Sequence, residues 1–264
     1  MLTISPSKQS HNAGMSTSGP STKSSTARAP LPCVLLTGFD AFGEDRYAAP
    51  AINPSGLAVR ALNGKRIAGH RLLGAQLPTA FDASISELLR LMRLHKPALV
   101  ICVGQAGGRS ALSLERIAVN INDARIPDNA GSQPVDTPVV ADGPAAYFST
   151  LPIKAMLRAL QRKGFAAEVS QTAGTFVCNH VFYGLMHALA THRGFRQVRG
   201  GFIHVPFLPE QGSPSMPLEH LVQGLRLAVA CALATPQDIA RGAGAINLET
   251  AVDRFLPLAR PHGH

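Results

Sequence analysis

Cys178 lies in a sequence setting that suits a nucleophile. It follows a glycine-containing stretch, residues 171–177, and it precedes apolar residues that recur at helical spacing from Phe182 to Leu189. The pattern predicts that Cys178 lies in the first turn of a helix, where unpaired N–H groups and the positive end of the helix dipole favour the reactive thiolate. The alternative is an inert core residue, the usual fate of an intracellular cysteine.

A histidine, His204, lies near the end of another apolar stretch, residues 201–206. A Cys–His pair is the minimum for acyl transfer, because the imidazole holds the thiolate and later protonates the leaving amine, while a third polar group orients the ring. Glu115 and Asp128 are the two candidates for this third group. The alternatives are a strand-end histidine satisfied by backbone and, for Glu115 beside Arg116, a solvated ion pair.

A zinc site is the rival use of these residues, since Cys178, His180 and His187 fall on or near one predicted helix. There is no H-E-x-x-H pattern, and the two histidines are separated by two turns rather than one. The cysteines show neither paired metal-ligand spacing nor the density of a disulfide scaffold. We therefore expect no metal and a reducing compartment. The scattered cysteines are Cys33, Cys102, Cys178 and Cys231.

The elements that must position these residues alternate between strands and helices. Buried or extended runs predict strands at 33–37, 69–77, 98–103, 112–121, 166–170 and 201–206, and helical spacing predicts helices from Ser55 as the cap, at 81–92, at 150–163, behind Cys178 and at 218–229. This alternation predicts an α/β protein with a mostly parallel sheet covered on both faces. Sites in such sheets lie beyond the carboxyl ends of the strands, where loops 39–42, 105–108 and 176–178 and His204 would gather.

Three loops have unusual compositions. Residues 104–108 are rich in glycine, but their spacing is not that of a nucleotide site. Phe39 and Phe42 lie between glycines just past a strand, so they either cap the core or line an apolar pocket. The stretch to about residue 144, punctuated by Pro and Gly, is too long for a simple connection and suits a lid or an interface.

Composition and charge narrow the class of protein. A 264-residue chain suits one large α/β domain or two small ones, and no apolar stretch is long enough to cross a bilayer. Of the formal charge of +9, three units come from residues 1–30, and the remainder is dispersed, so we expect neither a nucleic-acid partner nor a membrane partner. Residues 1–30 have the composition of a disordered tail, which would also suit a transit peptide but lacks a secretory signal.

Six segments, in order, resemble the pyroglutamyl-peptidase I family of cysteine peptidases. They are 37–43 (TGFDAFG), 104–109 (GQAGGR), 114–120 (LERIAVN), 124–129 (ARIPDN), 173–180 (AGTFVCNH) and 201–206 (GFIHVP). The resemblance covers about residues 33–235. It implies a three-layer α/β/α sandwich and a cofactor-free enzyme that removes N-terminal pyroglutamate from peptides. It also implies a homotetramer, for which residues 130–144 are a plausible interface, and we expect a cytoplasmic location.

Carried over by position, the resemblance makes Cys178 the nucleophile, His204 the base and Glu115 the acidic residue. Asp128 matches a second acidic residue of the family, so the partner of His204 stays open, and Arg125 or Arg109 could add positive charge at the oxyanion. Pyroglutamate is small, flat and uncharged, which calls for an aromatic slot with few polar groups. The predicted substrate-binding residues are Phe39, Phe42 and Phe176 for the slot, Thr79, Ile126 and Val177 to close it, and Gln105 and Asn53 for the lactam.

Two parts of the chain depart from the family pattern. The segment 44–52 is longer than usual, which affects the rim of the pocket, and residues 1–30 and 241–264 fall outside the single peptidase domain expected at 31–240. The competing hypothesis is a catalytically inactive or nucleoside-binding protein built on a similar sheet.

Overall fold

A seven-stranded sheet forms the centre of the computed structural model, which describes residues 31–43 and 51–243. From edge to edge the strands are β2 (Arg66–Ile67), β3 (His70–Leu77), β1 (Cys33–Phe39), β4 (Leu99–Gln105), β9 (Arg199–Val205), β5 (Leu112–Glu115) and β8 (Ala167–Ser170). Strands β3, β1, β4 and β9 are mutually parallel, β2 is antiparallel to β3, and β5 is antiparallel to β9 but parallel to β8. The predicted mostly parallel sheet is confirmed.

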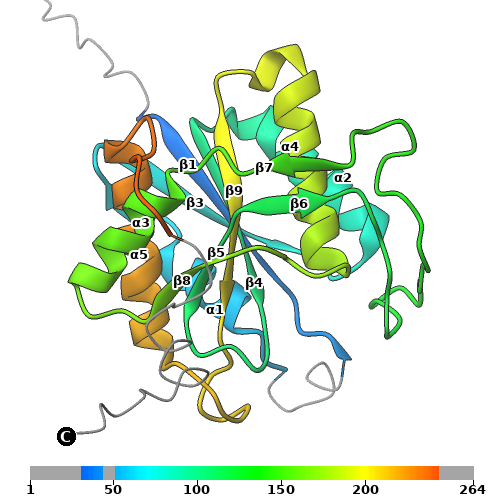
Figure 1. Ribbon diagram of the computed structural model, residues 1–264, viewed down its shortest axis with the longest axis horizontal. Coiled ribbons are helices and arrows are strands. Elements are labelled where there is room, and N and C mark those ends of the chain that lie inside the picture. The colour runs from blue at the N-terminus through cyan, green and yellow to red at the C-terminus, as the bar shows by residue number, and fades with distance from the viewer. Residues whose placement is uncertain (1–30, 44–50, 244–264) are drawn as a thin grey trace, which may run out of the picture. The chain divides into compact units, whose positions relative to one another are not determined.

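Helices cover both faces of this sheet (Figure 1). One face carries α1 (Pro54–Leu62), α3 (Ile153–Arg162) and α5 (Leu218–Ala234), and the other carries α2 (Phe81–His95) and α4 (Val177–Thr191). Each face has its own apolar core, because side chains of successive strand residues point to opposite sides. The three-layer α/β/α sandwich expected from the family resemblance is therefore present.

This alternation decides which strand residues meet α4. On β4, Leu99, Ile101 and Val103 belong to the core beneath α1, α3 and α5, whereas Val100 and Cys102 belong to the core beneath α2 and α4. By the same alternation Gly104 faces α4, and on β9 His204 shares a side with Phe202 of that second core.

A small second sheet lies beside α4. It pairs β6 (Ile117–Val119) with the antiparallel β7 (Ala146–Phe148). The predicted continuous extended segment at 112–121 is thus wrong in one respect, because it is divided between β5 of the main sheet and β6 of the small one. Neither β2 nor β7 was predicted, since each has only two or three residues.

The first helix begins differently from the prediction. Asn53, not Ser55, is the N-cap of α1, and its side chain accepts a hydrogen bond from the Ser55 N–H at 3.0 Å, with Pro54 following the cap. Both residues are good caps in isolation, and the proline at the first helical position favours the cap before it. Residues 1–30, most of 44–52 and most of the 241–264 segment lie outside the described residues. Within the described ranges, no helix is long and apolar enough to span a bilayer.

Candidate active site

Cys178 lies where the sequence pattern places it, as the second residue of α4, and it is partly exposed. Its sulfur occupies space that a glycine leaves free on β4. A Cβ atom added at Gly104 would lie 2.7 Å from Cys178 Sγ and 2.8 Å from Cζ of Phe202, both too close for a real contact. Gly104 is therefore needed for the thiol to rest on the sheet.

His204 lies beside this glycine on the neighbouring strand. Gly104 of β4 and His204 of β9 are direct partners in the parallel register, and both residues face α4. The imidazole is buried and its ring centroid lies 4.8 Å from that of Phe202. The thiol and the imidazole thus converge on the same small region of the sheet surface.

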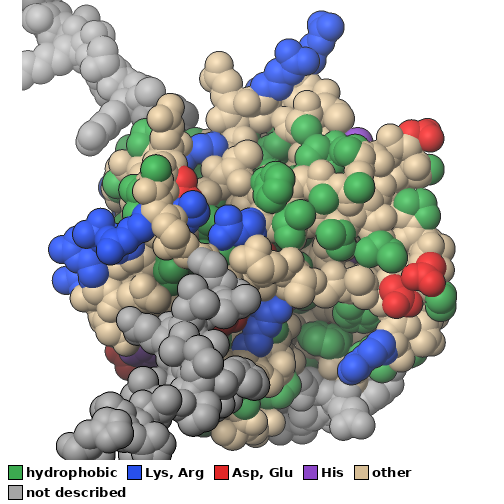
Figure 2. Space-filling model, in the orientation of Figure 1, with side chains coloured by type: hydrophobic (Ala, Val, Ile, Leu, Met, Phe, Trp, Pro, Cys, Tyr) green, Lys and Arg blue, Asp and Glu red, His purple; other side chains and the backbone are tan. Residues whose placement is uncertain are grey.

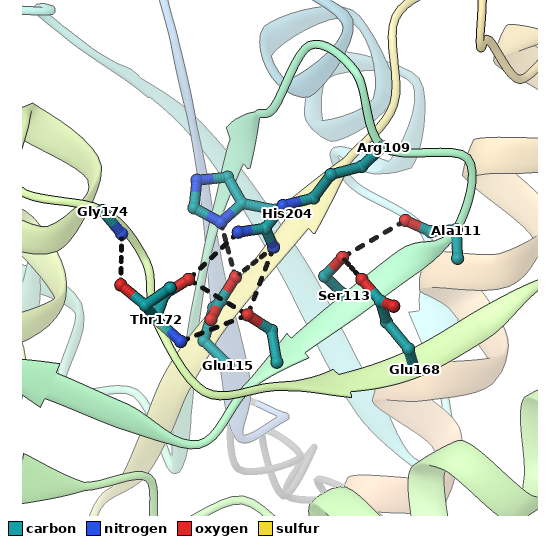
Figure 3. A network of polar contacts seen from close by, with 9 residues as sticks. Arg109, Ala111, Ser113, Glu115, Glu168, Thr172, Gly174 and His204 are labelled. Atoms are coloured by element: carbon teal, nitrogen blue, oxygen red, sulfur yellow. Dashed lines mark hydrogen bonds and ion pairs between the residues drawn. The ribbon is translucent and has the colours of Figure 1, made fainter. Parts of the chain in front are cut away.

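Glu115 is the partner of His204. Its carboxylate is fully buried, and Oε1 lies 2.7 Å from Nδ1 of His204 (Figure 3). A carboxylate oxygen can only accept, so Nδ1 donates the hydrogen bond and the neutral ring keeps Nε2 as its free base. Strand β5 makes this contact possible because it runs antiparallel to β9 and presents Glu115 on the α4 side.

Asp128 has a different task. Its Oδ2 accepts from the Phe81 N–H at 2.9 Å, and its Oδ1 accepts from the N–H groups of Ala130 and Ser132, each at 2.8 Å. The carboxylate thereby organises the start of α2 and the turn that follows Asp128. Of the two predicted acidic candidates, Glu115 is hydrogen-bonded to His204, and the Asp128 carboxylate is bonded to backbone N–H groups instead.

The two candidate oxyanion arginines are placed differently from each other. Arg109 donates from Nη1 to Glu115 Oε1 at 2.7 Å, so its guanidinium is engaged behind His204 rather than held for an oxyanion. Arg125 is exposed on the segment between β6 and β7.

The pKa of Cys178 is shifted in the direction opposite to the one expected at the start of a helix, where the thiolate would be favoured. Although the residue as a whole is partly exposed, its sulfur packs against the sheet at Gly104. The pKa of the thiol is raised to about 12, chiefly by this burial and then by the negative charge of Glu115, while Arg109 acts in the opposite direction. At neutral pH the thiol therefore keeps its proton until a base removes it. Nε2 of His204 is the base that the geometry offers.

Part of the predicted aromatic slot is assembled. The ring centroids of Phe42 and Phe176 lie 6.0 Å apart, and Phe176 meets Phe81 edge-on at 5.4 Å. Ile126 is 42% exposed, and a Cβ at Gly43 would lie 3.7 Å from its Cδ1, which places it beside the loop that carries Phe42. These three residues, Phe42, Phe176 and Ile126, form an accessible apolar surface next to the head of α4.

The remaining apolar and hydroxyl residues predicted for the pocket are buried beneath this surface. Phe39 packs against Phe202 with centroids 6.4 Å apart, and Val177 is fully buried in the core. Thr79 is buried as well, and its N–H donates to the Asp40 side chain at 2.7 Å. These three residues therefore lie behind the predicted slot and do not line it.

The two residues predicted to bind the lactam already have protein partners. Asn53 caps α1 and donates from Nδ2 to the Asp40 carbonyl at 2.8 Å, so its amide fixes the 39–42 loop. Gln105, at the end of β4, accepts from Nε2 of Gln211 at 3.0 Å. A direct lactam contact from Asn53 is thus not supported, because its side chain is committed to the loop.

Several polar residues that hold the site were not predicted. Asn179, next to the cysteine, is fully buried and bonds to both backbone groups of Val119 and to the carbonyl of Ile121. Ser170 accepts from Arg109 Nη1 at 3.3 Å. The GQAGGR segment contains Arg109, but nothing near it in the sequence indicates its partners.

The zinc alternative is not supported by the arrangement of its residues. Nδ1 of His180 lies 2.9 Å from Oδ1 of Asn122, and Nδ1 of His187 lies 3.0 Å from the Tyr147 hydroxyl. Among the residues that the structure describes, no group of three or more His, Cys, Asp and Glu side chains could hold a metal ion.

Known proteins share both the sequence and the fold. The family model described as pyroglutamyl peptidase matches residues 33–235. A pyrrolidone-carboxylate peptidase of Cupriavidus taiwanensis is 57% identical over 222 residues, which cover 82% of this chain and 100% of the relative. A pyrrolidone-carboxylate peptidase of Bacillus cytotoxicus is 49% identical over 80% of this chain and 97% of its own length.

Solved structures give the same result. The crystal structure of pyroglutamyl peptidase I from Bacillus amyloliquefaciens superposes with a TM-score of 0.76 at 45% identity and covers 81% of this chain and 100% of that one. A mutant pyrrolidone carboxyl peptidase from Pyrococcus furiosus superposes with a TM-score of 0.72 at 40% identity, over 76% of this chain and 98% of that one. The similarity therefore extends over nearly the whole length of each relative.

Proposed function

Because the chain belongs to the pyroglutamyl peptidase family and removes N-terminal pyroglutamate from peptides, we propose that Cys178, His204 and Glu115 carry out this hydrolysis. The observation that carries the proposal is the 2.7 Å contact between Glu115 Oε1 and His204 Nδ1, on the strand beside the glycine that seats the Cys178 sulfur. The alternative of an inactive or nucleoside-binding protein is not favoured by these relatives.

The first step forms a thioester. Nε2 of His204 takes the thiol proton as the sulfur attacks the carbonyl carbon of pyroglutamate, which fits a thiol whose pKa is raised by burial. No side chain of the described residues caps α4 at Phe176, so first-turn N–H groups are free to stabilise the oxyanion. The C–N bond then breaks, and His204 returns the proton to the departing amine.

The second step releases the acid. Water gives a proton to Nε2 of His204 and attacks the thioester carbonyl, the C–S bond breaks, and the proton returns to the sulfur. Glu115 holds the ring so that Nε2 faces the reacting atoms in both steps, and its negative charge stabilises the imidazolium that forms in each.

Substrate selection follows from the surface beside α4. Phe42, Phe176 and Ile126 offer apolar contact to a flat, uncharged ring, and we propose that Gln105 completes the recognition of the lactam. A free amino terminus would bring a charged ammonium into this surface, at a desolvation cost that rejects it.

Replacing the nucleophile tests the reaction directly. We expect Cys178→Ala and Cys178→Ser to lose the cleavage of a fluorogenic pyroglutamyl amide, because neither variant can form the thioester. Cys231→Ala, a change at a partly buried cysteine of α5, is the matched control and should keep full activity. Full activity in Cys178→Ala would contradict the mechanism. Protection of Cys178 from alkylation by 2-pyrrolidone would support the location of the substrate site.

Replacing one aromatic ring tests the slot. Phe42→Ala should raise KM for pyroglutamyl amides and lower kcat/KM by roughly 10- to 200-fold, the range for losing apolar contact in a pocket. Phe165→Ala removes an equal ring from the core beneath α5, on the other face of the sheet, and should leave kcat/KM nearly unchanged. Equal cleavage of prolyl and pyroglutamyl amides by the wild type would refute the assignment of the slot.

We also propose that the enzyme is a cytoplasmic homotetramer that uses residues 130–144 in its interface. Val135 of this segment is 65% exposed and Phe148 of the adjoining β7 is 68% exposed. The free state of all four cysteines is in keeping with a reducing compartment such as the cytoplasm.

Hydrophobic side chains gather on the side of the molecule where β6, β7 and residues 130–144 lie (Figure 2). A monomeric mass in light scattering at micromolar concentration would refute the assembly.

A further inference from the structure

Arg109 contacts both Glu115, the partner of His204, and the loop that leads to Cys178. Nη1 donates to Glu115 Oε1 at 2.7 Å and to Ser170 Oγ at 3.3 Å, and Nη2 donates to the Thr172 carbonyl at 3.0 Å (Figure 3). Its side chain is 26% exposed, whereas that of Glu115 is fully buried. Arg109 therefore reaches from the surface to a carboxylate that solvent does not touch.

The first set of contacts fixes Glu115. Arg109 and His204 both donate to Oε1, and within the part of the chain that the structure describes Oε2 has no hydrogen-bond partner. Because only Oε1 is bonded, the carboxylate could rotate about its Cγ–Cδ bond if either Arg109 or His204 were missing. Arg109 thus supplies a permanent positive charge and a second hydrogen bond to Oε1, which together hold this oxygen against the ring of His204.

The second set of contacts fixes the loop before the cysteine. Residues 171–176 connect β8 to α4, and Arg109 holds their start through Ser170 and Thr172. The far end is held independently, because the Thr175 hydroxyl donates to the Asp123 carbonyl at 2.7 Å and the Asp123 N–H donates to the Thr175 carbonyl at 3.0 Å. Phe176 and Cys178 follow this anchored loop directly.

We propose that Arg109 is a positioning residue that aligns both halves of the pair, by holding Glu115 against His204 and by anchoring the loop that presents Cys178. The inference rests on the roles proposed above for those three residues. Arg109 does not touch the reacting atoms in this arrangement. It acts through Glu115 on the imidazole and through the backbone on the thiol.

Kinetics of arginine variants provide the first test. We expect Arg109→Met to lower kcat by roughly 10²-fold, the cost of a misplacement of about 1 Å, while KM changes much less because Phe42 and Phe176 remain. Arg109→Lys should recover only part of the loss, since an ammonium cannot contact Glu115 and Thr172 together. Arg90→Met, at a 58% exposed arginine on α2, is the matched control and should behave as the wild type. A kcat for Arg109→Met equal to that of the wild type would overturn the proposal.

Chemical rescue separates positioning from a general structural role. Arg109→Ala leaves a space that opens to solvent, so millimolar guanidinium should restore several-fold activity, and sodium chloride at the same ionic strength should not. Thermal unfolding of the variant, measured without guanidinium, should show a folded protein. A variant that stays folded but gains nothing from guanidinium would count against the side-chain contacts as the cause.

A double-mutant cycle with Glu115→Gln completes the test. The loss from Arg109→Met should shrink in the Glu115→Gln background, because the part that acts through Glu115 is already gone, and a smaller loss through the loop should remain. If the fold-losses in kcat from Arg109→Met and Glu115→Gln simply multiply in the double variant, the two residues act independently and the inference is refuted. If Cys178→Ala kept its activity, the proposed mechanism would fail instead, so the two failures are distinguishable.

Discussion

Two buried histidines lie close to Cys178, and the Nδ1 atom of each ring has a different kind of partner. His180 follows the cysteine on α4 and His204 lies on β9, and each is 3% exposed. Nδ1 of His204 faces a carboxylate oxygen of Glu115 at 2.7 Å, whereas Nδ1 of His180 faces an amide oxygen of Asn122 at 2.9 Å. Both rings are thus oriented through the same nitrogen.

The partner, rather than the burial, separates the two histidines. A carboxylate stabilises an imidazolium, so His204 can accept a proton during the reaction. An amide cannot offset the cost of a buried charge, and the pKa of His180 is lowered to about 4, chiefly by burial and against the opposing charges of Asp82 and Asp128. Burial therefore favours the neutral form of the histidine nearest to Cys178 in sequence, and the distant one has the carboxylate partner that the proposed acid–base role requires.

Replacing His204 should cause the greatest loss of activity of any change at the two histidines. His204→Ala should lower kcat by about 10⁴-fold, because the general base is lost. His180→Gln keeps an amide donor for Asn122 and should leave kcat within a few-fold of the wild type. Steady-state cleavage of a pyroglutamyl amide measures both, and thermal unfolding checks that each variant is folded. If kcat falls as much in His180→Gln as in His204→Ala, the reaction depends on both histidines, and the proposed difference between them is wrong.

A second change makes the two sites alike. Glu115→Gln gives His204 the kind of partner that His180 already has, an amide in place of a carboxylate. We expect kcat to fall by about 10³-fold with a small change in KM, because the imidazolium loses its counter-charge while the slot is untouched. Glu168→Gln is a control, since the Glu168 carboxylate accepts a hydrogen bond from Ser113 on the neighbouring strand, whereas His204 is bonded to Glu115. Equal activity of Glu115→Gln and the wild type would remove Glu115 from the mechanism.

The sequence predicts well what depends on near neighbours. The alternation of strand and helix, the two covered faces and the place of Cys178 at the head of α4 all follow from patterns a few residues long. Two of the residues predicted for the aromatic slot, Phe42 and Phe176, also lie in contact. Phe39, two residues past the predicted strand at 33–37, is instead the last residue of β1 and packs against Phe202 in the core.

The pairing of polar groups depends on which strands are neighbours, and that is not a local property. Glu115 reaches His204 because β5 inserts beside β9 in the antiparallel direction, whereas Asp128 lies on a loop that turns to the start of α2. The two carboxylates are equivalent candidates until that topology is known. Arg109 was named only as a possible source of positive charge at the oxyanion. Its contacts with Glu115, Ser170 and Thr172 were not predicted, since these residues come together only when β5 pairs with β8.

His180 should make the stability of the folded protein depend on pH. Its pKa is about 4 in the folded protein against an ordinary value of 6.5, so the unfolded chain binds the proton more tightly. The neutral histidine therefore contributes stability that is fully present above pH 6.5 and is lost as the pH falls to about 4, by about 3 kcal/mol in the free energy of unfolding. Urea unfolding between these pH values measures the loss, on top of the loss caused by other groups.

The variant Asn122→Asp isolates this contribution, because it places a carboxylate against His180 as Glu115 lies against His204. The pKa of His180 should rise towards or above its ordinary value, since the charged ring gains a counter-charge. The free energy of unfolding of the variant should then fall less than that of the wild type between pH 6.5 and pH 4, by up to the same 3 kcal/mol or so. His180→Gln, which cannot titrate, should also lack this part of the loss. If all three proteins lose the same stability over this range, His180 is not held neutral by burial, and its amide partner does not explain why His204 rather than His180 serves Cys178.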